Sequence, residues 1–321
     1  MQLRKLGRSG LEIAPLVLGG NVFDWTADPA HSFAILDAFV AGGFNCVDTA
    51  DVYSRWVPGH AGGESEVVLG DWLKARGGRD KVIVATKFGA PMADDKKGLR
   101  AGYMMQAVEA SLGRLKTDYI DLYQSHFDDP EAPQDEVAEA FGRLVKDGKV
   151  RAIGASNFTA ERLASALKAA ADAGVPRYES LQPQYNLADR DKFEGPLQDL
   201  CVAEDVGVIC YYGLASGFLT GKYRSEADLA KSPRGRGVKR YLDERGMRIL
   251  AALDAVAGEA GATPAQVALA WLMAQPGVTA PIASATTTAQ LEEIMGAARL
   301  RLEAGQVAAL DAASAIETVA A

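Results

Sequence analysis

The feature that most constrains the fold is an alternation of short, apolar, β-rich runs with longer segments of helical apolar spacing. Several runs are almost continuous in Val, Ile and Leu, which is typical of strands buried on both faces of a parallel sheet. Eight strand–helix units in 321 residues favour a closed barrel over an open sheet. The sequence therefore predicts an α/β fold of the (β/α)8 TIM-barrel type. The eight runs are centred near Leu16, Val47, Val84, Leu122, Ile153, Leu181, Ile209 and Ile282.

Segments of helical spacing lie between these runs, as a barrel requires. Residues 3–14 precede the first run and are predicted to form a β-hairpin around an Arg-Ser-Gly turn. We expect further helices at the C-terminal end. Because the chain contains no internal repeat or linker, we treat 1–321 as a single domain. The helical segments cover 30–43, 64–78, 104–115, 135–148, 160–174, 196–207, 244–261 and 264–277.

Composition excludes several classes of protein. With 48% hydrophobic residues the chain can bury a large core, and a net charge of -8 makes nucleic acid and anionic membranes poor partners. Three cysteines without a CxxC spacing and three scattered histidines argue against a disulfide framework or a metal site. No apolar run approaches the length of a membrane span, and the N-terminus does not resemble a signal peptide. We therefore expect a cytoplasmic protein.

Two nucleotide-binding motifs were tested against the sequence. The first run ends in LGGNVFDW, which lacks the G-x-G-x-x-G pattern of a Rossmann fold. GFLTGKY contains a Gly-Lys pair, but Tyr223 stands where a P-loop needs Ser or Thr. Neither motif predicts the function of this chain.

Polar residues at the carboxyl ends of the runs are the candidates for chemistry, since barrel active sites lie there. Asp48 and Tyr53 follow the second run, Lys87 ends the third and His126 ends the fourth. A nearby ammonium should lower the pKa of Tyr53 from about 10, and a carboxylate should keep Lys87 charged. Histidine can orient a carbonyl oxygen. Together these groups could protonate an alkoxide as hydride arrives.

The motifs DTADVYS, TKFG, LYQSH, IGASNF, LQPQYN and GLASGFLTGKY, in this order, resemble the aldo-keto reductase family. The similarity is to bacterial-type members related to potassium-channel β-subunits. It implies an NADP(H)-dependent oxidoreductase of aldehydes or ketones, with NAD(H) as the alternative cofactor. It also implies that Tyr53 is the general acid and base, that Asp48 and Lys87 tune it, and that His126 orients the carbonyl.

The resemblance further implies a cofactor site. Ser156, Asn157 and Gln182 would hold the nicotinamide carboxamide, and Tyr211 would stack on its ring. We also assign Gly20, Asn21 and Arg234 to this site. The loop around the pyrophosphate would comprise Gly213, Leu214, Ser216, Gly217, Leu219 and Lys222, and the adenosine end would meet Ser284, Thr286, Gln290 and Glu293.

Two departures from the family pattern bear on the cofactor. Many relatives read Tyr-Ser-Pro-Leu where this chain has Tyr-Tyr-Gly-Leu from Tyr211. Many NADP-specific members have Lys and Arg where this chain has Ser284 and Gln290. The region from Thr220 to Glu244 is a long segment without periodicity, and its seven basic residues up to Arg240 fit an anion-covering loop.

Each candidate alone has a plainer interpretation. Asp48 could cap a helix, Tyr53 could be a half-buried aromatic, and Lys87 could lie at the surface. The joint pattern favours an active reductase of a small-molecule carbonyl or alcohol. Two alternatives stay open: a cofactor-binding regulatory subunit with little turnover, and a Schiff-base aldolase that uses Lys87. Trp25 and Trp56 are expected to line the pocket mouth, while the sequence leaves the oligomeric state open, monomer or homo-oligomer.

Overall fold

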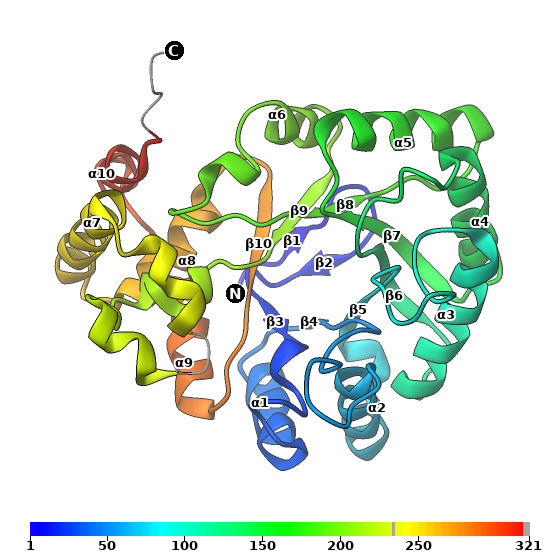
Figure 1. Cartoon of the computed structure of the whole chain (residues 1–321), viewed down its shortest axis with the longest axis horizontal. Coiled ribbons are helices and arrows are strands. Elements are labelled where there is room, and N and C mark those ends of the chain that lie inside the picture. Colours follow the sequence, from blue (N-terminus) through cyan, green and yellow to red (C-terminus); the bar gives the residue numbers. More distant parts are fainter. Residues whose placement is uncertain (233–234, 317–321) are drawn as a thin grey trace.

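The computed structural model describes residues 1–232 and 235–316 and contains a closed barrel of parallel strands (Figure 1). The strand order is β10-β3-β4-β5-β6-β7-β8-β9, so each strand pairs with its neighbour in sequence and the last pairs with the first. This confirms the predicted (β/α)8 TIM-barrel fold. The strands are β3 (Val17–Gly19), β4 (Cys46–Asp48), β5 (Ile83–Phe88), β6 (Ile120–Ser125), β7 (Val150–Ser156), β8 (Ser180–Gln182), β9 (Gly207–Cys210) and β10 (Val278–Ala283).

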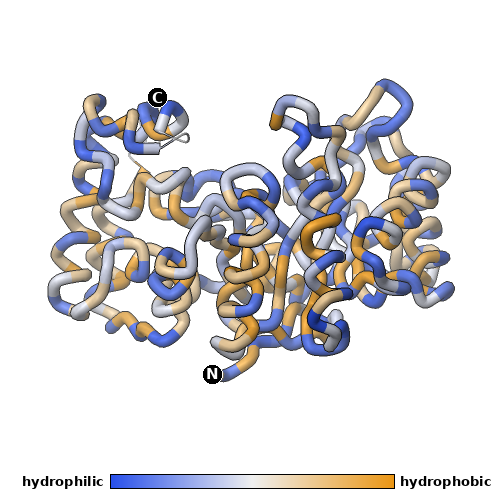
Figure 2. Tube along the Cα trace, turned by 90° about the horizontal axis from the view of Figure 1, so that it is seen from below, coloured by the Kyte–Doolittle hydropathy of each residue, from blue (hydrophilic) through white to orange (hydrophobic). Residues whose placement is uncertain are grey.

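Helices surround the barrel, and every predicted helical segment is helical in the structure (Figure 1). Their apolar stripes pack against the outer face of the strands and form the main hydrophobic core. In Figure 2 the hydrophobic stretches gather toward the inside and the hydrophilic ones toward the periphery. The helices are α1 (Pro29–Ala41), α2 (Glu64–Arg76), α3 (Ala101–Leu115), α4 (Gln134–Lys146), α5 (Ala160–Ala173), α6 (Pro196–Ala203), α7 (Glu244–Ala260), α8 (Pro264–Ala274), α9 (Thr288–Gly296) and α10 (Ala304–Ser314).

The segment after β9, which lacked a periodic pattern, forms three short 3-10 helices. They are η4 (Ala215–Thr220), η5 (Glu226–Lys231) and η6 (Gly235–Tyr241). A 3-10 helix has three residues per turn and therefore no apolar stripe of period 3.6, so apolar spacing in the sequence does not predict it. No helix of the described residues is long and apolar enough to cross a membrane.

The N-terminal hairpin closes one end of the barrel. β1 (Arg4–Lys5) pairs antiparallel with β2 (Glu12–Ile13), as predicted. Leu6 and Ile13 are fully buried and pack with the inward side chains of the strands in a separate small core. The hairpin therefore seals the amino-terminal end, and the polar side chains gather at the other end.

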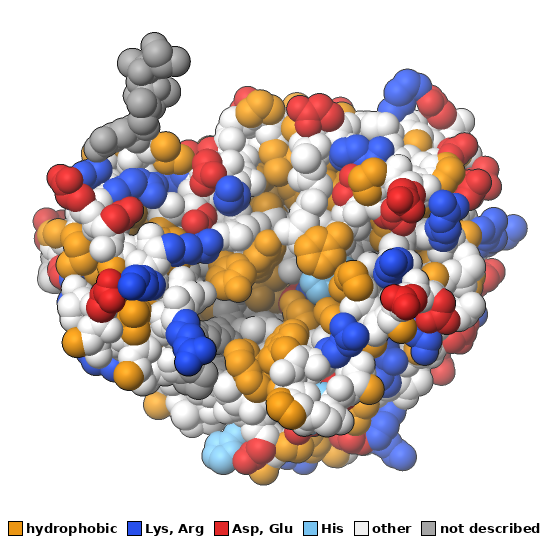
Figure 3. All heavy atoms as spheres, in the orientation of Figure 1, with side chains coloured by type: hydrophobic (Ala, Val, Ile, Leu, Met, Phe, Trp, Pro, Cys, Tyr) orange, Lys and Arg blue, Asp and Glu red, His pale blue; other side chains and the backbone are white. Residues whose placement is uncertain are grey.

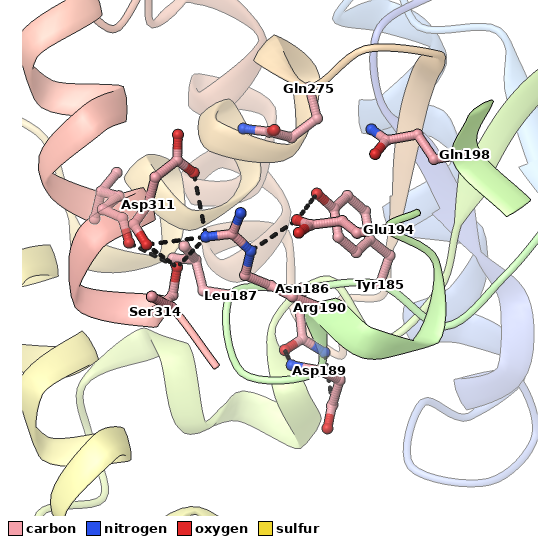
Figure 4. Close-up of polar contacts among 12 residues, drawn as sticks. Tyr185, Asn186, Leu187, Asp189, Arg190, Glu194, Gln198, Gln275, Asp311 and Ser314 are labelled. Carbon is pink, nitrogen blue, oxygen red and sulfur yellow. Dashed lines mark hydrogen bonds and ion pairs between the residues drawn. The ribbon is translucent and has the colours of Figure 1, made fainter. Parts of the chain in front are cut away.

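The C-terminal helix is fastened to the loop after β8 through Arg190 (Figure 4). Its guanidinium Nη1 donates to the carbonyl oxygen of Asp311 at 3.0 Å and to Ser314 Oγ at 3.0 Å. Its Nε donates to Glu194 at 2.7 Å, and Glu194 also accepts the Tyr185 hydroxyl at 2.7 Å. These charge-assisted bonds fix α10 against a loop that begins one residue after Gln182.

The hairpin turn gives a testable prediction about Gly7. Gly7 has φ +54, and a Cβ there would lie 2.3 Å from the carbonyl oxygen of Glu179, so Gly7→Ala adds a backbone clash to the left-handed strain. Gly10, with φ +77 and nothing within 4 Å, is the matched control. We expect Gly10→Ala to lower the free energy of unfolding by about 1 kcal/mol and Gly7→Ala by roughly 3 kcal/mol or more. Urea denaturation measures both, and equal losses would contradict the close approach.

Candidate active site

The side chain of Lys87 lies at the centre of the candidate site. Lys87 comes from β5 and is fully buried. Its Nζ donates to Asp48 Oδ2 at 2.6 Å and to the carbonyl oxygen of Thr49 at 2.8 Å. Asp48, at the end of the neighbouring strand β4, is only 1% exposed. A buried ammonium is stable only with such partners, so the two strands present one ion pair to the barrel mouth.

Tyr53 and His126 complete the cluster predicted from the sequence. The Tyr53 hydroxyl donates to Asp48 Oδ2 at 3.4 Å, and Lys87 Nζ lies 4.8 Å from the centre of the Tyr53 ring. The rings of Tyr53 and His126 are 6.0 Å apart. The structure thus brings Asp48, Tyr53, Lys87 and His126 together over one end of the barrel.

The predicted direction of the Tyr53 pKa is wrong. Burial raises the pKa of Tyr53 well above its ordinary value, and the Asp48 carboxylate raises it further. Burial also lowers the pKa of Lys87, although Asp48 opposes that shift. The ammonium was expected to dominate, but desolvation and the adjacent carboxylate outweigh it at this depth. Tyr53 therefore keeps its proton at neutral pH.

His126 is a neutral imidazole in this setting. Burial, followed by the positive charge of Lys87, holds its pKa well below the ordinary value. Its Nδ1 is buried without a hydrogen-bond partner among the described residues, so Nε2 is the nitrogen left to meet a substrate. The ring stacks on Phe127 with centres 4.9 Å apart.

The residues expected at the nicotinamide carboxamide lie next to this cluster. Asn157 has a left-handed φ of 59 and donates from Nδ2 to the carbonyl oxygen of His126 at 2.9 Å. Its Oδ1 accepts the Tyr211 hydroxyl at 2.7 Å. Ser156 Oγ donates to the carbonyl oxygen of Gln182 at 2.8 Å. Strands β7, β8 and β9 therefore place these groups in one network beside His126.

The loop after β9 has the backbone shape of an anion cradle. Tyr212, Ala215 and Ser216 have φ values of 59, 48 and 58, and Gly217 has φ 93. Successive left-handed residues turn backbone N–H groups toward one side. A Cβ on Gly217 would lie 3.4 Å from Lys222 Nζ, so the lysine ammonium sits against this turn.

Gly213 and Leu214 lie inside the same turn. Their amides donate to no other backbone group of the described residues, and no carboxylate there pairs with Lys222. Amides without a backbone acceptor in the described part of the chain, beside an ammonium that contacts only the Tyr223 ring there, fit a phosphate group. Leu219, by contrast, is fully buried in the main core and its amide donates to the carbonyl oxygen of Leu214 at 3.2 Å, so the structure does not present it to a ligand as the sequence predicted.

The residues expected at the adenosine end form two smaller contacts. Ser284 Oγ donates to Asn21 Oδ1 at 2.5 Å, which brings the ends of β10 and β3 together beside Gly20. Gln290 Oε1 accepts from the amide and from the hydroxyl of Thr286, both at 2.9 Å. Glu293 lies one turn further along α9, and Arg234 falls outside the described residues.

Most of the basic residues in the loop after β9, which fits an anion-covering loop by its sequence, are paired with carboxylates in the structure. Among the described residues, carboxylates pair with four of them but with neither Lys222 nor Arg236. Two of the partners come from outside the loop and could not be predicted from its residues. The pairs are Arg224–Asp254, Lys231–Asp228, Lys239–Glu226 and Arg240–Asp189.

Hydrophobic side chains gather around the hollow at the centre of the face that Figure 3 shows. Trp56 packs edge-on against Tyr53 at 6.0 Å and against Trp25 at 5.5 Å. Trp56, Phe127 and Tyr212 are each close to half exposed although they are large and apolar. Exposed apolar groups that rim a hollow are typical of a small-molecule binding site.

Gln124 was not predicted from the sequence, and Gln182, which was predicted to hold the nicotinamide carboxamide, contacts Asp48 in the structure. Gln182 Nε2 donates to Asp48 Oδ1 at 2.8 Å, and Gln124 Nε2 approaches the same oxygen at 3.3 Å. Both glutamines are buried. Strand alternation was the available signal, because Gln124 lies two residues before His126 and so faces the same side.

Comparison with known proteins agrees with this geometry. The model of the Aldo/keto reductase family matches residues 15–315. The uncharacterized oxidoreductase YrpG of Bacillus subtilis is 35% identical, over 94% of this chain and 93% of its own. Protein tas of Escherichia coli is 32% identical over 99% of both chains. A probable voltage-gated potassium channel subunit beta of Arabidopsis thaliana is 32% identical, over 92% of this chain and 91% of its own.

The chain belongs to the aldo/keto reductase family. The resemblance identified from the motifs is therefore confirmed. Membership supports an oxidoreductase, and the family typically uses nicotinamide cofactors. Among the described residues, no group of three or more His, Cys, Asp or Glu side chains is arranged to hold a metal ion.

This aldo/keto reductase carries a second buried acid beside the cluster. Asp51 is 3% exposed, and its Oδ1 has no hydrogen-bond partner in the part of the chain that the structure describes. Burial raises the pKa of Asp51 to about 8, and the Glu66 carboxylate adds to the shift. The motif DTADVYS gave no reason to single it out, since burial depends on how helices α2 and α3 pack outside the strands.

Asp51 makes the stability of the protein depend on pH. Its folded pKa of about 8 lies above the ordinary value, so folding favours the protonated acid, and this contribution is lost as pH rises toward 8. Between pH 5 and pH 8 the free energy of unfolding of the wild type should therefore fall. In Asp51→Asn it should fall by a smaller amount over the same range. Urea denaturation at both pH values measures this, with the exposed Asp94→Asn as control. Equal falls in wild type and Asp51→Asn would contradict the assignment.

Proposed function

We propose that this protein is a nicotinamide-dependent reductase of aldehydes or ketones, reversible toward the alcohols, with Tyr53 as general acid and base. The observation that carries the proposal is the contact of Tyr53 and of the buried Lys87 with the same oxygen of Asp48. This contact lies beside the Ser156, Asn157 and Tyr211 network. A proton donor and a fitting nicotinamide site thus share one opening.

The chain's own groups account for the proton chemistry. Ser156, Asn157 and Tyr211 would hold a reduced nicotinamide, which would supply hydride to the carbonyl carbon. Tyr53 holds a proton at neutral pH and transfers it to the carbonyl oxygen, and the reverse transfer serves alcohol oxidation. The Lys87 ammonium, 4.8 Å from the tyrosine ring, stabilises the tyrosinate that forms. Neutral His126 can hydrogen-bond the oxygen from Nε2 without competing for the proton.

We propose NADP(H) as the cofactor, with NAD(H) as the alternative. Arg236 supports this, because it is a cation of the covering loop that no carboxylate of the described residues neutralises, whereas Lys222 faces the turn that fits the pyrophosphate shared by both cofactors. A 2′-phosphate adds negative charge that a cation such as Arg236 can neutralise. Ser284 and Gln290 add neutral groups at the adenosine end.

Two other functions are less well supported. The relative named as a potassium channel subunit beta suggests a regulatory subunit, but the complete proton-transfer cluster favours turnover. A Schiff-base aldolase needs an accessible lysine nucleophile. Lys87 Nζ is engaged by Asp48 and Thr49 and is fully buried, so a carbonyl carbon has little access to it.

Replacing the proton donor tests the mechanism. Tyr53→Phe should lower kcat for aldehyde reduction by at least about 100-fold, because the acid is removed, while the Kd for NADPH changes little. Tyr123→Phe is the matched control, since the buried Tyr123 hydroxyl has no partner among the described residues. Steady-state kinetics across an aldehyde panel gives the readout. Wild-type turnover in Tyr53→Phe would exclude Tyr53 as the acid.

Cofactor preference is tested by fluorescence titration with NADPH and NADH. We expect NADPH to bind at least about tenfold more tightly, equivalent to one additional charge-assisted contact. Lys222→Gln should weaken both cofactors, because the lysine faces the turn that fits the shared pyrophosphate. Tighter binding of NADH would reverse the cofactor assignment, and no binding of either would refute the proposed function.

A further inference from the structure

A closed triangle of hydrogen bonds lies beneath the candidate site. Its members are Asp48, Gln124 and Gln182, which are 1%, 0% and 2% exposed. Gln182 Nε2 donates to Asp48 Oδ1 at 2.8 Å and to Gln124 Oε1 at 3.2 Å, while Gln124 Nε2 donates to Asp48 Oδ1 at 3.3 Å. We call this set the amide–carboxylate triangle.

In the triangle, the two carboxylate oxygens of Asp48 accept hydrogen bonds from different partners. Oδ1 accepts the glutamine amides, and Oδ2 accepts Lys87 and Tyr53. The terminal torsion of a carboxylate is broad, so its plane turns easily unless partners hold it. Amide donors on Oδ1 keep Oδ2 directed at the lysine and the tyrosine.

The triangle also orients Gln182. Both hydrogens of its amide are used, one by Asp48 and one by Gln124. Its Oε1 accepts no hydrogen bond from the described residues, and it is not one of the fully buried polar atoms that lack a partner there. It can therefore accept a hydrogen bond from a ligand. Without the Gln124 acceptor, the Gln182 amide could turn over and present a donor in place of this acceptor.

Gln124 is held in this position by the strands on each side. On β6 it pairs in register with Lys87 of β5 and with Gly154 of β7. A Cβ at Gly154 would lie 3.1 Å from Gln124 Cγ, so the missing side chain makes room for the glutamine. The backbone therefore aims Gln124 at the point where Asp48 and Gln182 meet.

We propose that Gln124 is a positioning residue that orients both the Asp48 carboxylate and the Gln182 amide. The buried Gln124 side chain thus fixes the orientation of one group on the proton-donor side of the site and of one group on the cofactor side. The proposal rests on the proposed reductase function. Its chemistry is hydrogen bonding alone, and Gln124 exchanges no proton with the substrate.

Gln124→Met tests this, because methionine keeps the length and volume but makes no strong hydrogen bond. Gln124→Met leaves the Gln182 amide on Oδ1 but removes the second donor, so the Asp48 carboxylate can turn Oδ2 away from Lys87. The ammonium then loses support, and the basic limb of the pH profile of kcat should move about one unit lower. The Kd for NADPH, read by fluorescence without turnover, should rise about fivefold to tenfold. Gln124→Asn, whose amide is one methylene shorter, should move both readouts in the same directions.

Ser125→Ala is the matched control. Ser125 is the next residue on β6 and its buried hydroxyl bonds with the Tyr178 hydroxyl at 2.7 Å, away from the triangle. Its loss should lower Tm but leave the basic limb and the Kd unchanged. A basic limb or a Kd that is unchanged in Gln124→Met and Gln124→Asn would overturn the proposal. If the wild type reduces no carbonyl, the proposed function fails, whereas the Kd comparison still decides the role of Gln124.

Discussion

The buried ion pair between Lys87 and Asp48 is the interaction on which the rest of the site depends. Removing one partner of such a pair leaves an uncompensated charge and typically destabilises a protein by about 3–5 kcal/mol. Here the pair lies at the mouth of a barrel whose other end is closed by the N-terminal hairpin. The apolar strands thus hold two charges in place, and those charges position Tyr53.

The same ion pair links Tyr53, the proposed proton donor, to the proposed cofactor side of the site. Asp48 contacts Lys87 and Tyr53 through one oxygen and Gln182 through the other. Tyr211 and Asn157, which we propose hold the nicotinamide, bond to each other and reach the backbone of His126. Strand ends that are far apart in sequence therefore form one continuous polar network.

Much of this arrangement was predictable from the sequence. The near-continuous apolar runs predicted every strand, and parallel strands must place their carboxyl ends at one edge, so Asp48, Lys87 and His126 were expected to meet. The direction of the Tyr53 pKa was not predictable, because it depends on burial in the packed structure. Partners of the basic loop residues were missed as well, since Asp189 and Asp254 lie far along the chain.

Direct titration of Tyr53 tests the central claim most closely, namely that burial keeps this tyrosine protonated as an acid beside Lys87. The measurement is carbon NMR of the protein with tyrosine labelled at the ring carbon that bears the hydroxyl, with Tyr53→Phe to assign the signal. We predict no ionisation of Tyr53 below the ordinary tyrosine pKa of about 10. A Tyr53 signal that titrates between about pH 6 and 8 would contradict it and restore the lysine-dominated interpretation.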